Sequence, residues 1–340
     1  MQPARSKSNP APWAGIIFGI IFLTIWFWTP ITRTVNEWFG GTTVEVINPY
    51  SFHLQQPNLG MCLSHDGHFL ATAGDRSFAL WDIHSRKIVT RITLDQNIER
   101  IAYSHDGKML IMITDNSVKL WDTQHWTIMK SFDHASFGGL GELIRLTAPT
   151  GGQLIAALTD AEHEYITIYD VIAEKALMRI GAEYRNQLTF DSSSHLFAGY
   201  SRKQSRIAVW NMTSGEQEDT IPTDEFAGTL RISPNGRYLA WSARGLVMLF
   251  DRTTKKHKTL YHDMPYRHPL TAFSPDCTRI AVSQRDGIQL YDTSSGEKVA
   301  MLSSTSSDYK SLDFSQDGKT IAANYSYESM VDIWDLSDGR

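Results

Sequence analysis

The chain has 340 residues, 42% of them hydrophobic and 11% aromatic, and its formal net charge at pH 7 is −5. This acidic balance argues against a nucleic-acid-binding protein, which usually presents a basic surface. Nothing in the pattern pairs the two cysteines, Cys62 and Cys277, or gives them the spacing of metal ligands. Neither a disulfide framework nor a metal site is therefore indicated.

The amino-terminal region contains one long apolar segment. Residues 1–12 are polar and basic and contain proline, a composition typical of disorder. Residues 13–29 carry no charge, and a helix extended to residue 32 would span about 30 Å, the thickness of a bilayer core. Trp13 at one end and Trp26 and Trp28 at the other match the aromatic belts of membrane interfaces. We therefore predict a transmembrane anchor over residues 13–32.

The anchor has an alternative interpretation as a cleaved signal peptide, but the apolar run is long and no small-x-small cleavage pattern follows it. Gly15 and Gly19 form a G-x-x-x-G pair, which either seats a weak helix dimer or is a chance pair in a glycine-tolerant segment. Arg5 and Lys7 precede the span and Arg33 follows it. The positive-inside rule then places the following domain on the non-cytoplasmic side, close to the membrane because the linker, residues 33–41, is short.

Residues 98–122 define the repeating unit of the rest of the chain. Their three short apolar runs are separated by turn residues, Ser104-His105-Asp106-Gly107 and Asp115-Asn116. Runs this short, bounded in this way, are typical of antiparallel strands, and residues 127–132 supply a fourth. One such sheet cannot bury both of its faces alone, so it requires neighbours.

The third strand of that unit occurs seven times, each time reading apolar, any residue, aliphatic, aromatic, Asp or Asn. Its aromatic residues, 40 to 48 positions apart, are Trp81, Trp121, Tyr169, Trp210, Phe250, Tyr291 and Trp334. This period, with its Trp-Asp pairs, resembles the WD-repeat (WD40) family of β-propellers, in which each repeat forms one four-stranded blade. The resemblance implies an all-β, seven-bladed β-propeller of four-stranded antiparallel blades over residues 42–340, preceded by one transmembrane helix.

Two features of the repeats bear on how the ring is held together. No Gly-His pair stands where the family has one, and only Asp75 and Asp115 keep the family's aspartate six residues before the aromatic. We therefore expect apolar burial between blades and few buried polar networks. Residues 43–48 alternate like a strand before the first repeat, and the seventh repeat stops before its fourth strand. We predict that residues 43–48 close the last blade, which removes two exposed sheet edges.

The third repeat has the longest loops on one face of the predicted ring. These loops and the neighbouring loop of the fourth repeat would form a partner-binding patch. Its residues are Phe137, Glu162, Glu164 and Tyr165 of the third repeat and Arg202 and Lys203 of the fourth. Acidic and basic loops that merely screen one another are the other interpretation. Extra loop length on one face of a repeat protein favours the interpretation as a binding surface. The basic run at residues 252–258 falls on the opposite face, where we expect a solvated hairpin.

Signals of catalysis are weak, because the chain has no G-x-S-x-G, P-loop, H-E-x-x-H or G-x-G-x-x-G motif and its histidines are scattered. We predict no catalytic residue, no metal site and no cofactor. The leading hypothesis is a single-pass, membrane-anchored propeller that acts as a non-catalytic scaffold for protein partners. The alternatives are a propeller enzyme or cofactor-binding propeller of quinoprotein or lactonase type, and a cytosol-facing regulatory propeller at a membrane.

Overall fold

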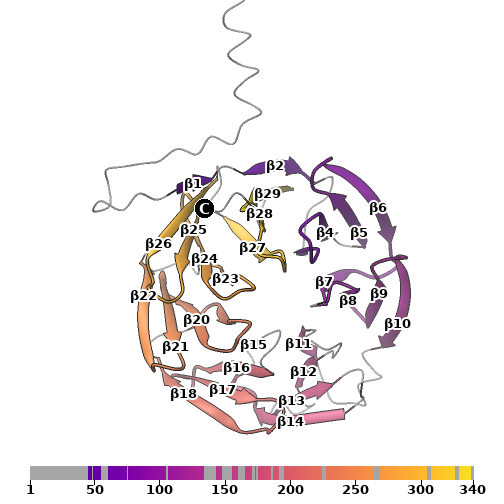
Figure 1. Cartoon of the computed structure of the whole chain (residues 1–340). Helices are drawn as coiled ribbons and strands as arrows, with labels where there is room; N and C mark the ends of the chain where they lie inside the picture. Colours follow the sequence, from indigo (N-terminus) through magenta and orange to yellow (C-terminus); the bar gives the residue numbers. More distant parts are fainter. Residues whose placement is uncertain are drawn as a thin grey trace, which may run out of the picture.

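In a computed structural model of the chain, the described strands form seven sheets that stand in a ring around a common axis (Figure 1). The described residues are 45–47, 49–54, 60–74, 76–104, 106–133, 143–147, 155–159, 165–170, 173, 175–184, 187–190, 195–223, 227–262, 269–304, 308–325 and 329–337. The predicted all-β organisation in four-stranded antiparallel blades is confirmed within these ranges.

The first four blades follow the chain, each running from an inner strand at the axis to an outer strand at the rim (Figure 1). Blade 1 comprises β3 (Gly60–Leu63), β4 (Phe69–Gly74), β5 (Ser77–Asp82) and β6 (Lys87–Thr93). Blade 2 comprises β7 (Ile98–Tyr103), β8 (Met109–Thr114), β9 (Ser117–Asp122) and β10 (Thr127–Asp133). Blade 3 comprises β11 (Leu143–Thr147), β12 (Ile155–Thr159), β13 (Tyr165–Asp170) and β14 (Lys175–Gly181). After the short 3₁₀ helix η2 (Ala182–Tyr184), blade 4 comprises β15 (Leu188–Phe190), β16 (Leu196–Ser201), β17 (Arg206–Asn211) and β18 (Gln217–Pro222).

The last three blades complete the ring, and two of them take a strand from the amino-terminal end. Blade 5 comprises β19 (Leu230–Ile232), β20 (Tyr238–Ala243), β21 (Leu246–Asp251) and β22 (Lys256–His262). Blade 6 comprises β23 (Thr271–Phe273), β24 (Arg279–Gln284), β25 (Gly287–Asp292) and β26 (Lys298–Ser303), with β1 (Glu45–Ile47) as a fifth strand. Blade 7 comprises β27 (Tyr309–Phe314), β28 (Thr320–Tyr325), β29 (Met330–Asp335) and β2 (Tyr50–His53).

The closing strand differs from the predicted one. The fourth strand of blade 7 is β2, which pairs antiparallel with β29 from Tyr50 opposite Ile333 to His53 opposite Met330. Within the predicted residues 43–48, only β1 is described as a strand, and it pairs in parallel with β26 on blade 6. Pro49 separates the two strands, and proline cannot donate a hydrogen bond to a strand ladder. The prediction that the amino-terminal segment closes the ring was right, but the residues assigned to the closing strand were wrong.

The predicted membrane anchor, residues 13–32 with Gly15 and Gly19, lies outside the described residues, as do residues 1–12 and the linker 33–41. Within the described ranges, no helix is both long enough and apolar enough to cross a membrane.

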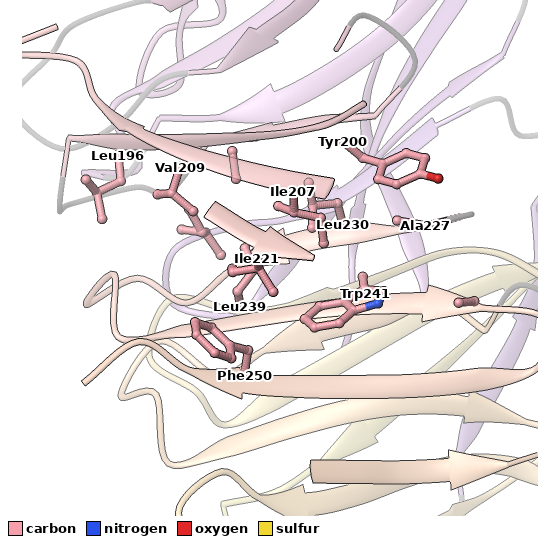
Figure 2. Close-up of a cluster of buried hydrophobic side chains, with 13 residues drawn as sticks. Leu196, Tyr200, Ile207, Val209, Ile221, Ala227, Leu230, Leu239, Trp241 and Phe250 are labelled. Atoms are coloured by element: carbon pink, nitrogen blue, oxygen red, sulfur yellow. The ribbon is translucent and has the colours of Figure 1, made fainter. Parts of the chain in front are cut away.

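The hydrophobic core of the described chain lies between blades, where the faces of neighbouring sheets pack together. Figure 2 shows the core between blades 4 and 5, where Ile207 and Val209 of β17 meet Leu239 and Trp241 of β20. All four side chains are no more than 4% exposed. Five further clusters of this kind lie at other blade junctions of the described chain.

The aromatic-Asp pattern has a local explanation. Six of the seven aromatic residues are at most 6% exposed and fill the junctions between blades, and Tyr169 is half-buried. The residue that follows each of them accepts a backbone N–H two or three positions further on, at 2.7–3.1 Å. In blades 1 to 6 this bond fixes the turn into the outer strand. One residue pair thus specifies both a buried anchor and the turn after it.

A buried polar network also holds the ring closed, which the sequence pattern did not lead us to expect. The Asp332 carboxylate on β29 is 1% exposed and accepts hydrogen bonds from three hydroxyl groups. Ser51 of β2 donates at 2.5 Å, Ser304 at the end of β26 donates at 2.7 Å, and the third donor is Tyr325 of β28. A single carboxylate therefore connects the closing strand, blade 6 and blade 7.

Two kinds of connection define the two faces of the ring. We call the face with the first-to-second and third-to-fourth strand turns the turn face; in blade 1 these turns are residues 64–68 and 83–86. The opposite face, with the second-to-third strand turns and the connections between blades, is the loop face. Five first turns share one design, in which a serine hydroxyl donates to an Asp or Asn oxygen two residues later at 2.5–2.7 Å.

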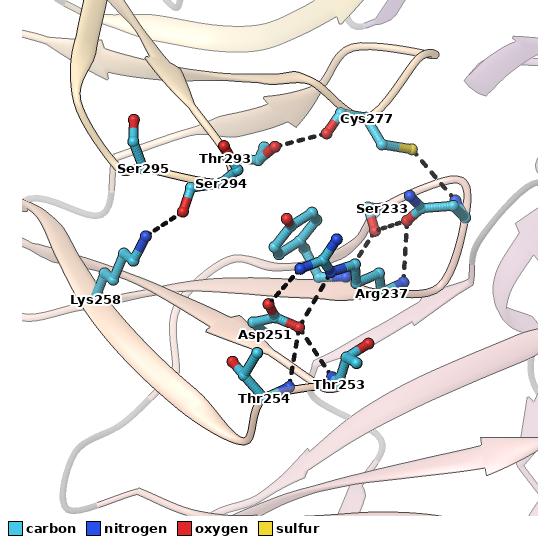
Figure 3. A network of polar contacts seen from close by, with 12 residues as sticks. Ser233, Arg237, Asp251, Thr253, Thr254, Lys258, Cys277, Thr293, Ser294 and Ser295 are labelled. Carbon is cyan, nitrogen blue, oxygen red and sulfur yellow. Dashed lines mark hydrogen bonds and ion pairs between the residues drawn. The ribbon is translucent and has the colours of Figure 1, made fainter.

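Cys277 departs from that turn design. It has φ 61° at a position that glycine occupies in four other turns, with φ of 67–72° at Gly67, Gly107, Gly236 and Gly318. A left-handed backbone costs a non-glycine residue roughly 1–2 kcal/mol. The Cys277 thiol in turn accepts the backbone N–H of Asn235 at 3.3 Å, which links this turn to blade 5 (Figure 3).

We expect Cys277→Gly to be more stable than Cys277→Ala by about 1 kcal/mol, because both variants lose the sulfur contact but only alanine keeps the strained backbone. Urea unfolding of the two variants measures the difference. Ser131, exposed in the regular strand β10, serves as the control, and there alanine should be the more stable of the pair. A more stable alanine variant at position 277 would contradict the strain argument.

The basic run at residues 252–258 is tied to the neighbouring blade. Arg252 is an ion-pair partner of Glu218 at 2.7 Å and of Asp219 at 2.6 Å, both on the outer strand of blade 4. Lys255 forms a further ion pair with Asp219, whose side chain is 7% exposed. Burial opposes ionisation of Asp219, but the hydrogen bonds from Lys255 and Arg252 hold its pKa below the usual range. Two residues of the predicted solvated hairpin therefore link blades 4 and 5.

Asp251, one residue before that run, forms an ion pair with Arg237 at 2.8 Å and accepts the backbone N–H groups of Thr253 and Thr254 (Figure 3). The Arg237 hydrogen bond is the main cause that lowers the pKa of Asp251 to about 2. Because this is below the ordinary value of 3.8, the stabilisation is complete above about pH 4 and is lost as the pH falls to about 2.

We expect Asp251→Asn to reduce the slope of unfolding free energy against pH between about pH 4 and pH 2, since one carboxylate no longer takes up a proton on unfolding. Urea midpoints measured across that range give the slope. Arg237→Met keeps the Asp251 carboxylate but removes the hydrogen bond that is the main cause of its lowered pKa, so this companion variant should reduce the slope as well. Equal slopes in wild type and Asp251→Asn would contradict the assignment.

Candidate functional site

The predicted partner-binding patch is described only in part. Tyr165 opens β13 and is 49% exposed. Arg202 and Lys203 are exposed in the turn between β16 and β17, so all three lie on the loop face. Phe137, Glu162 and Glu164 lie outside the described residues. Three of the six residues therefore lie on the expected face. That the six residues form one patch stays a prediction.

The basic turn of this patch is supported by the junction of blades 3 and 4. Tyr184 of η2 packs edge-on against Trp210 at 4.8 Å between ring centroids, and its hydroxyl accepts a hydrogen bond from Arg206 at 3.1 Å. Gln204 donates to Glu183 of the same helix at 3.2 Å. Arg206 is thus bound within the fold, and η2 holds in place the turn that carries Arg202 and Lys203.

A groove of about 380 Å³ lies on the turn face between blades 1 and 2. Its apolar lining includes Phe69, Leu80, Val89, Tyr103 and Trp126, and its polar edge includes His65, Asp66, Asp106 and Lys108. Val89 is 54% exposed. Apolar surface with a polar rim is a common form of protein-contact surface. Sequence analysis did not predict this groove, because its lining comes from both repeats.

Three charged side chains come from inner strands near the axis of the ring: Arg100 of β7, Arg231 of β19 and Asp313 of β27. Burial raises the pKa of Asp313 to about 6, although the Leu63 N–H, at 3.2 Å from its carboxylate, and the Arg231 charge oppose the rise. Burial lowers the pKa of Arg231; the Asp313 charge opposes this change and the Arg100 charge adds to it. The Arg231 charge of blade 5 therefore interacts with those of Asp313 of blade 7 and Arg100 of blade 2.

Two of these charged residues occupy the same position in their repeats, which the sequence alone could have shown. Arg231 and Asp313 each stand two residues before the serine of the first turn in their blade, Ser233 and Ser315. The equivalent residue of blade 1 is Cys62, and burial, with the Asp313 charge, raises the pKa of its thiol well above the usual value. Cys62 therefore remains a neutral thiol and is a poor nucleophile.

The described residues hold no group of three or more His, Cys, Asp or Glu side chains that could bind a metal ion. The exposed residues of the patch and the groove are the candidate contact surfaces of the described chain.

Two comparisons support the fold assignment. Residues 52–82, which span the end of β2 and the first three strands of blade 1, match the family model described as WD domain, G-beta repeat. The chain is similar to the crystal structure of the Cps50 (Swd1) β-propeller domain of Myceliophteria thermophila, with TM-score 0.63 and 15% identity over 85% of this chain and all of that one. The ring is therefore a β-propeller, with a first repeat of WD40 type.

The chain is also similar to pre-mRNA-processing factor 19 of Schizosaccharomyces pombe, with 27% identity over 124 residues. That match covers 36% of this chain and 25% of the factor, so the chain spans about a quarter of the length of this curated relative.

Proposed function

We propose that this protein is a non-catalytic interaction scaffold, a WD-repeat propeller that a single amino-terminal helix holds at a membrane. The observation that carries the scaffold role is the distribution of side chains on the propeller. Buried apolar residues fill the junctions between blades, and buried polar residues cap turns. The exposed features are residues of the loop-face patch and an apolar groove with a charged edge. WD40 propellers generally bind protein partners, which supports the same role. The uncharged residues 13–32 support the membrane anchor.

The partner contact that we propose is the loop-face patch of Phe137, Glu162, Glu164, Tyr165, Arg202 and Lys203. Tyr165 supports it because a half-exposed tyrosine at the edge of a blade is a good anchor for a partner. Proximity labelling from the propeller in its native membrane would identify the partner. A cofactor-dependent absorbance in the purified protein, or turnover of a substrate, would instead favour the quinoprotein or lactonase alternative.

We expect Tyr165→Ala combined with Lys203→Ala to weaken capture of that partner by about 2 kcal/mol, roughly 30-fold, if Tyr165 is an anchor residue. The melting temperature should stay close to the wild-type value, because both side chains are exposed. Lys256→Ala, exposed on the turn face, is the control and should leave capture unchanged. Loss of capture in the control but not in the double variant would place the contact on the turn face.

The proposed topology has the propeller on the non-cytoplasmic side. Protease added to sealed cells should then degrade the propeller while a cytosolic marker survives. Full protection of the propeller would favour the cytosol-facing regulatory alternative, in which the scaffold serves partners inside the cell.

A further inference from the structure

The groove between blades 1 and 2 has walls that the fold holds in place. In blade 2, the Thr123 hydroxyl donates to the carbonyl oxygen of Gly107 at 2.8 Å, and the Thr123 N–H donates to that of Lys108 at 3.1 Å, so the two turns are joined. Trp126 of the second turn reaches blade 1, where its ring lies 5.5 Å from that of Phe78 between centroids. Because these walls are already ordered, an occupant does not have to order them on binding.

Trp126 forms one wall of the groove from an unusual backbone conformation. Its φ is 54°, in the left-handed region that bulky residues rarely adopt. The equivalent residues of four other blades are Arg86, Gly215, Lys255 and Gly296. Backbone strain of this kind occurs preferentially at ligand-binding sites. Val89, which is 54% exposed, lines the same groove, so apolar surface stays accessible there.

The polar edge of the groove has hydrogen-bond acceptors in reserve. Asp66 and Asp106 each cap a first turn with one oxygen, Oδ1, which accepts a serine hydroxyl and a backbone N–H. Within the described ranges, the second oxygen of each carboxylate accepts no hydrogen bond. In blade 6, by contrast, the second oxygen of Asp276 accepts the Thr278 hydroxyl at 2.8 Å. The hydroxyl of Tyr103, which also lines the groove, has no hydrogen bond to the described residues either.

The edge of the groove carries a net negative charge. The hydrogen bond from the Ser104 hydroxyl is the main cause that lowers the pKa of Asp106. Burial opposes ionisation of Asp66, but hydrogen bonds, that of the Ser64 hydroxyl first, hold its pKa below the ordinary value. The lining contains these two carboxylates and one ammonium group, that of Lys108, with histidine counted as neutral. The edge therefore favours a cationic group whose N–H donors can reach the open carboxylate oxygens.

We propose that this groove binds a short peptide segment of a partner protein, in which a large apolar side chain is next to a lysine or arginine. The apolar side chain occupies the volume of about 380 Å³ beside Val89 and Trp126. The cationic side chain lies against Asp66 and Asp106. This inference rests on the scaffold role proposed above and adds a second contact, on the face opposite the loop-face patch.

The test is selection of a displayed library of random peptides on the purified full chain, followed by titration with the most enriched peptide. Enriched sequences should place Leu, Ile, Phe or Trp beside Lys or Arg, because the groove combines apolar walls with an anionic edge. Enrichment of acidic sequences, or of apolar sequences without a basic residue, contradicts the proposal.

Asp66→Asn combined with Asp106→Asn should weaken binding of that peptide at least about tenfold, as expected for loss of charge-assisted hydrogen bonds. Both turns should persist, because Asn235 has the same role in blade 5 and accepts the equivalent bonds at 2.7 and 3.0 Å. Asp276→Asn combined with Asp317→Asn makes the same change in blades 6 and 7. This matched control should bind the peptide as the wild type does.

Val89→Ser tests the apolar wall separately, since an exposed side chain can be changed with little effect on the core. It should weaken binding several-fold, because less apolar surface is covered. Val299→Ser is the control: Val299 is 36% exposed and stands at the same bulge in the outer strand of blade 6. Wild-type affinity in both groove variants, the aspartate pair and Val89→Ser, would rule out the groove as the binding site.

A last variant separates this proposal from the loop-face contact. Tyr165→Ala combined with Lys203→Ala should bind the selected peptide with wild-type affinity. Loss of binding in this variant would assign the peptide to the loop-face patch, which overturns the groove proposal and leaves the scaffold role in place. If the library yields no peptide while capture of the native partner depends on Tyr165 and Lys203, the groove proposal alone fails.

Discussion

Asp332→Ala should lower the free energy of unfolding by about 3 kcal/mol. The substitution leaves the hydroxyl groups of Ser51, Ser304 and Tyr325 without the charged acceptor that they share. A hydrogen bond to a charged group contributes roughly 1.5–3 kcal/mol, and part of this loss is recovered because Ser304 and Tyr325 can bond to each other. Urea unfolding of the purified chain measures the change.

Asp335→Ala is the control for this prediction, because Asp335 lies on the same strand but is exposed. Its carboxylate accepts the backbone N–H of Ser337 at 2.8 Å, so its removal should cost no more than about 1 kcal/mol. Asp332→Asn keeps the size of the side chain and one acceptor oxygen and should fall between the two. Equal stability of Asp332→Ala and the wild type would show that the carboxylate does not hold the ring closed.

Removal of the closing strand should have a larger effect. A chain that begins at residue 55 lacks β2, so the backbone groups of β29 lose their ladder partners and an open sheet edge is created. It also lacks Leu54, which is 5% exposed in the core between blades 7 and 1 and contributes roughly 1.5–3 kcal/mol by its burial. We expect this variant to lose cooperative unfolding or to aggregate.

Two further variants separate the roles of the amino-terminal strands. A chain that begins at residue 44 retains β1 and β2 and should unfold as the wild-type propeller does. A chain that begins at residue 49 loses β1 alone and should lose little stability, because blade 6 keeps its four antiparallel strands. If the chains beginning at residues 49 and 55 are equally stable, β2 is not the closing strand.

The sequence predicted the features of the fold that repeat. Each aromatic-Asp pair specifies a buried anchor and a capped turn within a few residues, so it can be recognised without knowledge of the partner blade. The closing strand could not be assigned in this way, since residues 43–48 and Tyr50–His53 both suit a strand. Pairing with β26 or β29 depends on where the ring brings the chain ends, which local alternation does not record.

The candidate sites were less predictable for a similar reason. Loop length pointed to the third repeat, and Tyr165, Arg202 and Lys203 do lie on the loop face. Arg231 and Asp313 belong to different repeats, and their charges interact only when the ring is closed. The groove at Trp126 is likewise formed by two repeats. Such convergent sites are invisible to motif searches that read one segment at a time.

The paired course of β1 and β2 determines how the propeller would respond to mechanical force. A pull on the chain before Glu45 acts along β1, whose parallel register with β26 runs from Glu45 opposite Ala300 to Ile47 opposite Leu302. The ladder bonds of β1 would then be loaded together in shear, and the force would reach β2 only after they had broken. Resistance to such a pull is a matter of unfolding rate rather than of equilibrium stability. The short fifth strand on blade 6 would therefore have to detach before the force could separate β2 from β29 and open blade 7.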